Sequence, residues 1–563
     1  MRSSEKPCNG QRSFPHGDFL NRRIKRAIIR NCARCFTSLP WRLRSRFLLV
    51  GRPPFLSKQH LAYYTARRRM DSRRSRGSHV PPVSCPTNDL TMFQRFGQAA
   101  TGSLRWEPPV AFTSTASHNT TNFGPACVQQ FPFAVAAINE QLFNTPPPPE
   151  SEDCLFLNVW APKSSTPTAV VIWIYGGALT FGTASTPTYD GASLAASQSI
   201  VVVSINYRTN VFGFPNSPDL PTAGNNLGFL DQGLAFQWVQ KNIAMFGGDP
   251  KKVTIMGQSA GGRSVASQYA SYAPGTAPFR AAIMISGSAE ARSPTPNFNS
   301  FNNMATALGC TQDPGAARLA CLKAVPASTI HNYTNGPASG IWTSFVDNVT
   351  VFTDPIHRVR DGKTAGVPFL LGTAENDGSL FALGQTNLTA YLAATFGTLV
   401  TADQVRAQYP SNQSDNAIIA ELIRDFTFLC PHQLWSAAAK AAGQRNVYRY
   451  SYGAVFANMQ VFPNAGAWHS SDLFEIFGTY NRTGTTHAEA TLSHTMQTIY
   501  GNFIRDPTSS PAPNWPRHVP GNTTRTLAKL AFNGNVELGN VVQAVRSSLN
   551  DAPCDALWDK FLA

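Results

Sequence analysis

Ser259 lies in a setting that suits a nucleophilic serine. It is the central residue of Gly-Gln-Ser-Ala-Gly at 257–261. Chance alone should produce Gly-x-Ser-x-Gly on the order of 0.2 times in a chain of this length, so the five letters are weak evidence against an ordinary glycine-rich loop. The flanking residues say more, because VTIM (253–256) has the pattern of a buried strand and AGGRSVASQYA (260–270) is compatible with a helix. In such a strand–turn–helix the serine projects from the sheet edge, beside the N–H groups that begin the helix.

A serine hydroxyl needs a base to remove its proton, and the base needs an acid to orient it. On the implied fold the order along the chain is serine, acid, histidine. The histidines that follow Ser259 are His331, His357, His432, His469, His487, His494 and His518. We favour His469, because NAGAWHSSDLFEIFG places it in a small-residue loop after the strand-like run VYRYSY (447–452). His432, at a predicted helix start, and His487 and His494, in a helix-like segment, have settings typical of structural or solvated side chains.

Two acids compete for the role of orienting the base. Glu375 and Asp377 both follow the strand-like run VPFLLG (367–372), and spacing alone does not choose between them. An oxyanion that forms at the substrate carbonyl also needs backbone N–H donors, one of them from Ala260. The remaining donors are expected in the glycine-rich turn of IWIYGGALTFG (172–182), whose other interpretation is a simple loop at a strand end.

The elements around these residues predict an α/β protein. Continuous apolar runs such as AVVIWIY (169–175) and SIVVVSIN (199–206) are expected of strands buried on both faces of a parallel sheet. Helical patterns lie between them, as in NLGFLDQGLAFQWVQKNIAMFGG, where Leu230, Leu234 and Trp238 recur at helical spacing. Further strands are predicted at 253–256, 281–286, 367–372 and 447–452. This alternation favours a mostly parallel, doubly wound sheet with helices on both faces.

The chain is strongly basic, with a formal net charge of +15, but the charge is confined to one end. Residues 1–90 hold 20 of the 47 Lys and Arg residues and 4 acids, whereas the rest holds 27 basic and 28 acidic residues. We therefore predict a basic, disordered extension over 1–90, or a start codon placed upstream of the real one, and a domain over 91–563. An alternative, nucleic-acid binding through 1–90, predicts salt-sensitive affinity that is lost when this segment is deleted, and we expect none.

Cysteines and glycosylation sequons favour a secreted protein. The domain holds six cysteines, an even number that suits three disulfides. They are Cys127, Cys154, Cys310, Cys321, Cys430 and Cys554. Seven Asn-x-Ser/Thr acceptors accompany them, at Asn119, Asn332, Asn348, Asn387, Asn412, Asn481 and Asn522. We expect secretion, although residues 1–90 show no signal peptide. We expect neither membrane insertion nor a cofactor. The lone CARC at 32–35 lacks the second pair of ligands that a metal site requires.

The motifs together resemble the type-B carboxylesterase family, which also contains cholinesterases and certain fungal lipases. They span about 93–563 in the family's order: SEDCLFLNVWAP, WIYGGA, NYRTNVFGF, NLGFLDQGLAFQWV, FGGDPKKVTIMGQSAGG, ENDGSLF and WHSSDLFEIFG. The resemblance implies an α/β-hydrolase fold. It also implies Ser259 as nucleophile, His469 as base and Asp377 as acid. The oxyanion donors that it implies are Gly177, Ala178 and Ala260.

The same resemblance implies three disulfides and one supporting residue. The implied pairs are Cys127–Cys154, Cys310–Cys321 and Cys430–Cys554. Ser286 resembles a residue that supports the acid.

Three departures from the family pattern bear on specificity and folding. Ala178 stands where many members have a third glycine, so its methyl narrows or stiffens that turn. Gln258 replaces the glutamate that precedes the nucleophile in cholinesterases, and no tryptophan lies between Cys127 and Cys154, which disfavours choline esters. The family's opening β-hairpin is missing ahead of FGQAATGSLRWEPP, and the basic segment stands in its place.

These observations predict a serine hydrolase that cleaves small-molecule or lipid carboxylic esters through an acyl-enzyme. A lipase of the same family is the nearest alternative, since FPFAVAAINEQLF between Cys127 and Cys154 has the composition of an apolar lid. A non-catalytic adhesion protein of the family is a further alternative. Such members typically lack part of the triad, whereas this chain has all three residues.

Overall fold

The computed structural model describes residues 90–562, apart from 114–121, 133–134, 289–293 and 522. The expectations for the extension, with CARC, and for Asn119 and Asn522 lie outside the described residues. The domain boundary that we place at residue 91 stays a prediction.

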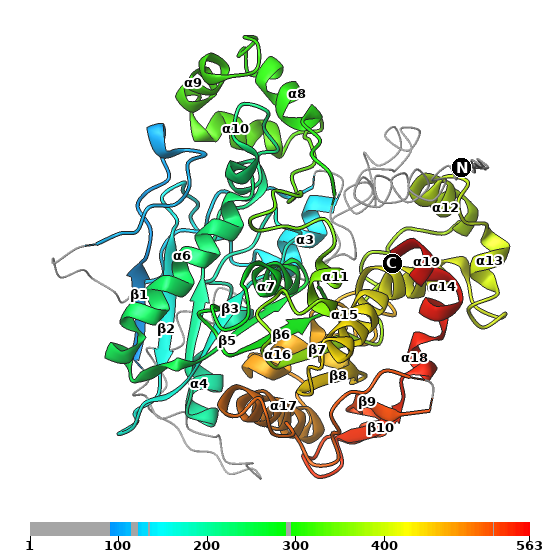
Figure 1. The fold of residues 1–563 in the computed structure, drawn as a ribbon. Helices are drawn as coiled ribbons and strands as arrows, with labels where there is room; N and C mark the ends of the chain where they lie inside the picture. Colours follow the sequence, from blue (N-terminus) through cyan, green and yellow to red (C-terminus); the bar gives the residue numbers. More distant parts are fainter. Residues whose placement is uncertain (1–89, 114–121, 133–134, 289–293, 522, 563) are drawn as a thin grey trace, which may run out of the picture. The chain divides into compact units, whose positions relative to one another are not determined.

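A ten-stranded sheet forms the centre of the described chain, in the order β1-β2-β4-β3-β5-β6-β7-β8-β9-β10 (Figure 1). The strands are β1 (Leu90–Arg95), β2 (Phe156–Ala161), β3 (Thr168–Ile174), β4 (Val201–Ile205), β5 (Gly248–Gln258), β6 (Ala281–Ile285), β7 (Phe369–Ala374), β8 (Val447–Tyr452), β9 (Arg525–Leu530) and β10 (Val542–Arg546). Pairing is parallel from β4 through β9, while β1, β2 and β10 pair antiparallel at the two ends. The predicted doubly wound, mostly parallel sheet is confirmed.

Burial explains why the apolar runs became strands. Every residue of β4, β6, β7 and β8 is buried, as expected for strands covered on both faces. Each of the six predicted strand segments corresponds to an observed strand: 169–175, 199–206, 253–256, 281–286, 367–372 and 447–452. Periodicity predicted no strand for the remaining four strands, β1, β2, β9 and β10, which lie at the two ends of the sheet.

The described helices connect the strands, and some of them cover the sheet on both sides. They are α3 (Ala136–Phe143), α4 (Ala192–Gln198), α5 (Asn210–Gly213), α6 (Leu227–Asn242), α7 (Ala260–Ser271), α8 (Asn299–Ala307), α9 (Ala316–Ala324), α10 (Ala327–Thr334), α11 (Pro355–Arg360), α12 (Leu388–Phe396), α13 (Ala402–Arg406), α14 (Asp415–Arg424), α15 (Cys430–Ala441), α16 (Ser471–Phe477), α17 (His487–Arg505), α18 (Ser548–Pro553) and α19 (Asp559–Leu562). α6 and α7 pack together on one side, and α4 and α17 pack together on the other (Figure 1).

The buried face of α6 differs from the expected one. Leu230, Leu234 and Trp238 do recur at helical spacing, but all three are only half-buried. The fully buried residues of α6 include Phe229, Phe236 and others on an adjacent stripe. Asp231 is buried there too, because its carboxylate pairs with Arg208, so polarity did not mark the solvent face of this helix.

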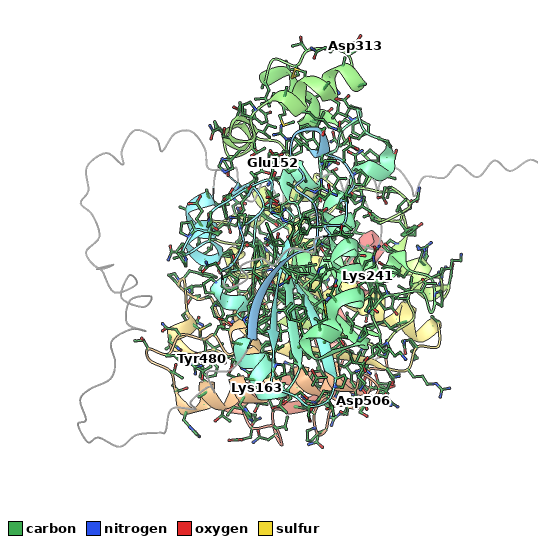
Figure 2. The ribbon with its side chains drawn as sticks, turned by 90° about the vertical axis from the view of Figure 1, so that its left-hand side faces the viewer. Glu152, Lys163, Lys241, Asp313, Tyr480 and Asp506 are labelled. Carbon is green, nitrogen blue, oxygen red and sulfur yellow. A yellow bond between two sulfur atoms is a disulfide. The ribbon has the colours of Figure 1, made fainter. Side chains whose placement is uncertain are left out.

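Three disulfides join the pairs that the family resemblance implies: Cys127–Cys154, Cys310–Cys321 and Cys430–Cys554. The last ties the C-terminal segment to the start of α15. On the outside of the domain, charges of both signs are spread out, as the exposed Lys163, Lys241, Asp313 and Asp506 illustrate (Figure 2). Among the described residues, no helix combines the length and apolar character needed to cross a bilayer.

Candidate active site

Ser259 occupies a strained turn between β5 and α7. Its backbone has φ 56° and ψ −125°, outside the regions that L-residues usually adopt. The Ser259 N–H donates to Ile285 O of the neighbouring strand β6 at 2.8 Å, which fixes the turn to the sheet. A Cβ on Gly257 would overlap the backbone of Gly261, and a Cβ on Gly261 would overlap Ile174 O. The glycines of the motif are therefore required by close backbone contacts.

His469 and Asp377 form a buried pair after strands β8 and β7. The His469 Nδ1 lies 2.9 Å from Asp377 Oδ1, and the two residues are 3% and 0% exposed. Asp377 Oδ2 accepts hydrogen bonds from Ser286 Oγ and from the Ala374 N–H, both at 2.8 Å. Donors of this kind favour the charged carboxylate, so Asp377 is suited to hold an imidazole by its Nδ1–H.

Asn376 and Trp468 bring the two segments together through a parallel β-bridge. Asn376 N–H donates to Ala467 O, and Ala467 N–H donates to Asn376 Oδ1, each at 3.0 Å. The residues that follow in each segment are Asp377 and His469, so this bridge aligns the acid with the ring.

Glu375, the alternative acid, lies elsewhere. Its Oε2 accepts a hydrogen bond from Ser451 Oγ of β8 at 2.9 Å. No contact joins it to His469 within the described residues. Glu375 and Asp377 are two residues apart and both follow β7, so the choice that spacing left open depends on three-dimensional contacts.

The sequence did not predict what surrounds the His469 ring. Phe428 stacks on it with ring centroids 4.8 Å apart, and Phe381 meets it edge to face at 5.0 Å. The Gln258 Nε2 lies 3.0 Å from the His469 Nε2. Gln258 was noted only as a departure from the family pattern. Its histidine partner is 211 residues away, so no local sequence signal could have identified this contact.

The turn after β3 presents unpaired N–H groups beside the serine. Gly177, Ala178 and Leu179 all have positive φ, at 94°, 55° and 63°. The N–H groups of Gly177 and Ala178, and that of Ala260 at the first position of α7, donate no hydrogen bond within the described chain. A Cβ on Gly176 would lie 3.0 Å from the Ser259 Cβ, which places this turn against the serine. These donors are available to an oxyanion.

A pair of tyrosines anchors that turn to the sheet. The rings of Tyr175 and Tyr207 stack with centroids 4.4 Å apart. Tyr175 OH donates to Tyr207 O, and Tyr207 OH donates to Tyr175 O, both at 2.9 Å. Burial raises the pKa of both phenols, so they remain neutral donors.

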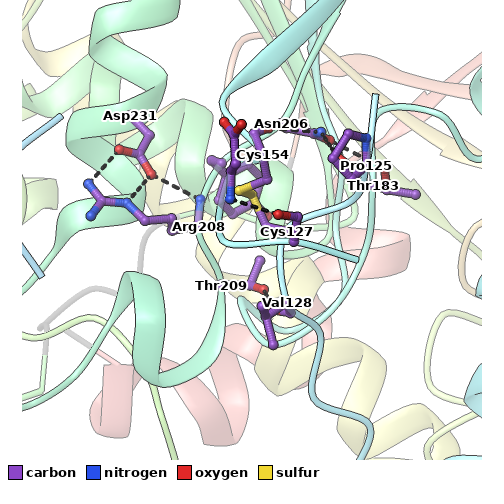
Figure 3. The surroundings of a disulfide bond; sticks show 12 residues. Pro125, Cys127, Val128, Cys154, Thr183, Asn206, Arg208, Thr209 and Asp231 are labelled. Atoms are coloured by element: carbon purple, nitrogen blue, oxygen red, sulfur yellow. Dashed lines mark hydrogen bonds and ion pairs between the residues drawn. A yellow bond between two sulfur atoms is a disulfide. The ribbon is translucent and has the colours of Figure 1, made fainter. Parts of the chain in front are cut away.

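The loop between Cys127 and Cys154 is held to the end of β4 (Figure 3). Asn206 Nδ2 donates to Pro125 O at 3.0 Å and to Cys154 O at 3.1 Å, while Thr209 Oγ1 donates to Val128 O at 3.0 Å. The loop carries α3. It also carries Phe131 and Phe143, which contact Phe181 beyond the glycine turn, with ring centroids 4.8 and 6.0 Å apart.

Two buried acids, Asp472 and Glu475, lie on α16, which begins two residues after His469. Tyr450 OH donates to Asp472 Oδ2 at 3.2 Å and lies 2.6 Å from Tyr500 OH. Burial, together with the charge of Asp377, raises the pKa of Asp472 to about 7. One turn further along the helix, burial and the charge of Glu489 raise the pKa of Glu475 to about 9.

The other histidines lie in different surroundings. His432 and His518 are buried, and burial lowers the pKa of each to about 3, so both are neutral. His487 and His494 are exposed on α17. None of the four contacts Ser259 or Asp377 in the described part of the chain.

One group of side chains has the spacing of metal ligands but not their chemistry. Within the described residues, one cluster has His, Cys, Asp or Glu atoms at ligand spacing: Cys430, Cys554 and Asp559. Its two sulfurs are joined as a disulfide and offer no thiolate.

The arrangement suits acyl transfer. A serine on a strained turn lies next to the residue that contacts an imidazole, the imidazole is held by a carboxylate, and the glycine turn with its free N–H groups lies against the serine. These are the parts that an attack on a carbonyl and the stabilisation of its oxyanion require.

Comparisons with known proteins agree with this chemistry. The model of the carboxylesterase family matches residues 94–555. The chain is 30% identical over 486 residues to secreted lipase 5 of Gibberella zeae, covering 78% of this chain and 86% of that protein. It is 30% identical over 455 residues to chlorogenic acid esterase of Aspergillus niger, covering 76% and 81%. It is also 30% identical over 435 residues to para-nitrobenzyl esterase of Bacillus subtilis, covering 73% and 84%.

Proposed function

Because the chain belongs to the carboxylesterase family and is a carboxylic ester hydrolase, we propose that Ser259, His469 and Asp377 form its catalytic triad. The observation that carries the proposal is the buried His469–Asp377 contact of 2.9 Å, beside the strained turn of Ser259. The substrates are esters of small carboxylic acids or of lipids, and choline esters are disfavoured by Gln258 and by the absence of tryptophan between Cys127 and Cys154.

The reaction proceeds through an acyl-enzyme. His469 Nε2 takes the Ser259 proton as the hydroxyl attacks the ester carbonyl, and the N–H groups of Gly177, Ala178 and Ala260 stabilise the oxyanion. His469 then gives the proton to the leaving alcohol. Water attacks the acyl-enzyme in the same way and releases the acid. Asp377 keeps the ring in the tautomer whose Nε2 accepts a proton.

Substitutions test each role. Ser259→Ala is expected to abolish turnover of p-nitrophenyl butyrate, and a fluorophosphonate probe should label Ser259 in the wild type alone. Asp377→Asn is expected to lower kcat by up to about 10⁴-fold, because the imidazole loses its orienting acceptor. Glu375→Gln is the matched control and should stay active. Full activity in Ser259→Ala would refute the proposal, and a crippled Glu375→Gln beside an active Asp377→Asn would move the acid to Glu375.

Lipase activity is the second candidate, supported by the loop of α3. Phe131 and Phe143 turn inward against Phe181, while Glu140 and Gln141 are exposed, so the loop has an apolar inner side and a polar outer side. Rates on p-nitrophenyl acetate, butyrate and palmitate, with and without an oil–water interface, separate the two functions. We expect the highest rates on the short esters without an interface. A strong increase at the interface with palmitate would assign a lipase.

Secretion and glycosylation belong to the same proposal. Three disulfides and the secreted lipase among the relatives support passage through an oxidising compartment. Five sequon asparagines lie in the described chain with exposed side chains, namely Asn332, Asn348, Asn387, Asn412 and Asn481. A mass loss on treatment with peptide N-glycosidase F, in protein secreted by a eukaryotic host, tests the modification. An unchanged mass would contradict it.

A further inference from the structure

The Nε2 atom of His469 has a partner that the proposed reaction does not use. It lies 3.0 Å from the Gln258 Nε2, and the two side chains are 3% and 2% exposed. The Ser259 hydroxyl makes no hydrogen bond within the described chain. In the resting arrangement, the atom expected to receive the serine proton therefore contacts an amide.

The hydrogen-bond network fixes which group donates. Asp377 accepts from Ser286 Oγ, from the Ala374 N–H and from His469 Nδ1, so the Nδ1 carries a proton. A neutral imidazole then has one lone pair, at Nε2. The amide N–H of Gln258 donates to that lone pair, because two acceptors would repel each other at 3.0 Å.

We propose that Gln258 is a positioning residue for the general base: its amide N–H holds the His469 Nε2 in the resting enzyme and gives way to the Ser259 hydroxyl during attack. This inference rests on the proposed catalytic roles of Ser259 and His469. Gln258 is the last residue of β5, directly before the strained turn, so the strand that presents the nucleophile also restrains the base.

The contact favours one charge state of the ring. The amide N–H stabilises the neutral imidazole, whereas the imidazolium carries its own proton at Nε2 and repels that N–H. When His469 becomes protonated, the amide has to rotate. Its Oε1 makes no hydrogen bond in the described chain and lies beside Gly176, where a Cβ would approach it to 3.1 Å. The position of the Gln258 amide is therefore coupled to proton transfer at the His469 Nε2.

Other groups around the ring act independently of the amide. Asp377, after β7, is the carboxylate in contact with the ring, and Asp472 of α16 interacts electrostatically with Asp377. Phe381 and the π-helical segment Asp425–Leu429, through Phe428, cover the ring with apolar groups. Replacing Gln258 changes neither of these acids nor the two phenylalanines, so the substitution tests the amide alone.

The pH profile of kcat/KM measures the effect. The wild type, Gln258→Met and Gln258→Glu are compared between pH 4.5 and 8.5 on p-nitrophenyl butyrate. Methionine has a similar length but lacks the N–H donor. We therefore expect the acid limb of the kcat/KM profile, the pH below which activity falls, to shift to higher pH by about half a unit to one unit. Glu adds a negative charge beside the ring, and we expect a shift of about 1–3 units in the same direction.

Gln268→Met is the matched control, because Gln268 is a buried amide of α7 that donates to Phe229 O at 2.8 Å, away from His469. It should leave the acid limb in place. An acid limb that stays put or moves down in both Gln258 variants would overturn the inference. If Gln258→Met does not fold, the isosteric Gln258→Glu decides alone by the same criterion. If Ser259→Ala is inactive but the acid limb is unshifted in the Gln258 variants, this inference is refuted and the proposed function still stands.

Discussion

Replacing Glu475 by glutamine tests the buried acids behind the active site. The Glu475 side chain is 1% exposed, and neither carboxylate oxygen has a hydrogen-bond partner among the described residues. Glu489 and Asp472 add negative charge nearby, and Arg482 offsets only part of it. These surroundings raise the pKa of Glu475 from 4.5 to about 9, with burial as the largest cause.

The sign and the size of the effect follow from proton binding. In the folded protein Glu475 keeps its proton up to about pH 9, whereas the unfolded chain releases it near pH 4.5. Between these values the unfolded state binds fewer protons, so the free energy of unfolding falls as the pH rises. A pH of 7.5 is three units above the pKa of Glu475 in the unfolded chain. At about 1.4 kcal/mol per unit, the stability lost is about 4 kcal/mol relative to acidic solution.

Glu475→Gln keeps the shape of the protonated acid and removes its titration. We expect the variant to match the wild type near pH 5 and to exceed it by about 4 kcal/mol at pH 7.5. Urea unfolding, followed by tryptophan fluorescence at pH 5, 6, 7.5 and 8.5, measures the difference. Glu140→Gln, at an exposed position of α3, is the control and should run parallel to the wild type. Parallel pH dependence of Glu475→Gln and the wild type would refute the reasoning.

Three further predictions concern the turn and the disulfides. Gly176→Ala is expected to lower kcat/KM about 100-fold at unchanged circular dichroism, because the new Cβ would lie 2.8 Å from Gln258 O and displace the nucleophile; wild-type rates would contradict this. Ala178→Gly, at φ 55°, is expected to favour bulky acyl groups over acetyl in kcat/KM ratios, and an unchanged ratio would show that the methyl does not shape the site. Replacing both Cys430 and Cys554 by serine should lower the free energy of unfolding in urea by about 5 kcal/mol, because that disulfide closes a loop of 124 residues. Replacing both Cys310 and Cys321 should lower it by about 3 kcal/mol, because that loop spans 11 residues, and the reverse order would contradict the loop-entropy argument.

The parts of the fold that the sequence predicted are those in which local pattern and burial agree. The apolar runs of β3 and β4 became central strands, and VTIM became the end of β5. The strands β9 and β10, at one end of the sheet, were not predicted, because they are only partly buried and their sequences mix polar and apolar residues. On α6 the periodicity found the helix and missed its buried face, since Asp231 is buried by pairing with Arg208 rather than by apolar packing.

The candidate site divides in a similar way. Ser259, the Glu375/Asp377 segment and the glycine turn all follow strands at their carboxyl ends, so strand prediction was enough to place these segments together. The distinction between Glu375 and Asp377 required the Asn376–Trp468 bridge and the Ser451 contact, neither of which leaves a trace in sequence spacing. Phe428 reaches His469 from a π-helical segment, an irregularity that periodicity does not reveal.

Two polar groups near His469 and Asp377 were not predicted from the sequence, namely the Gln258 amide and Asp472. Asp377 stabilises a protonated His469, whereas the Gln258 amide N–H stabilises the neutral ring. Burial and the charge of Asp377 raise the pKa of Asp472 to about 7. Above that pH, ionised Asp472 adds a second negative charge that acts on Asp377. The proposed role of Gln258 therefore sets a neutral donor at the His469 Nε2 against the carboxylate that holds the Nδ1 of the same ring.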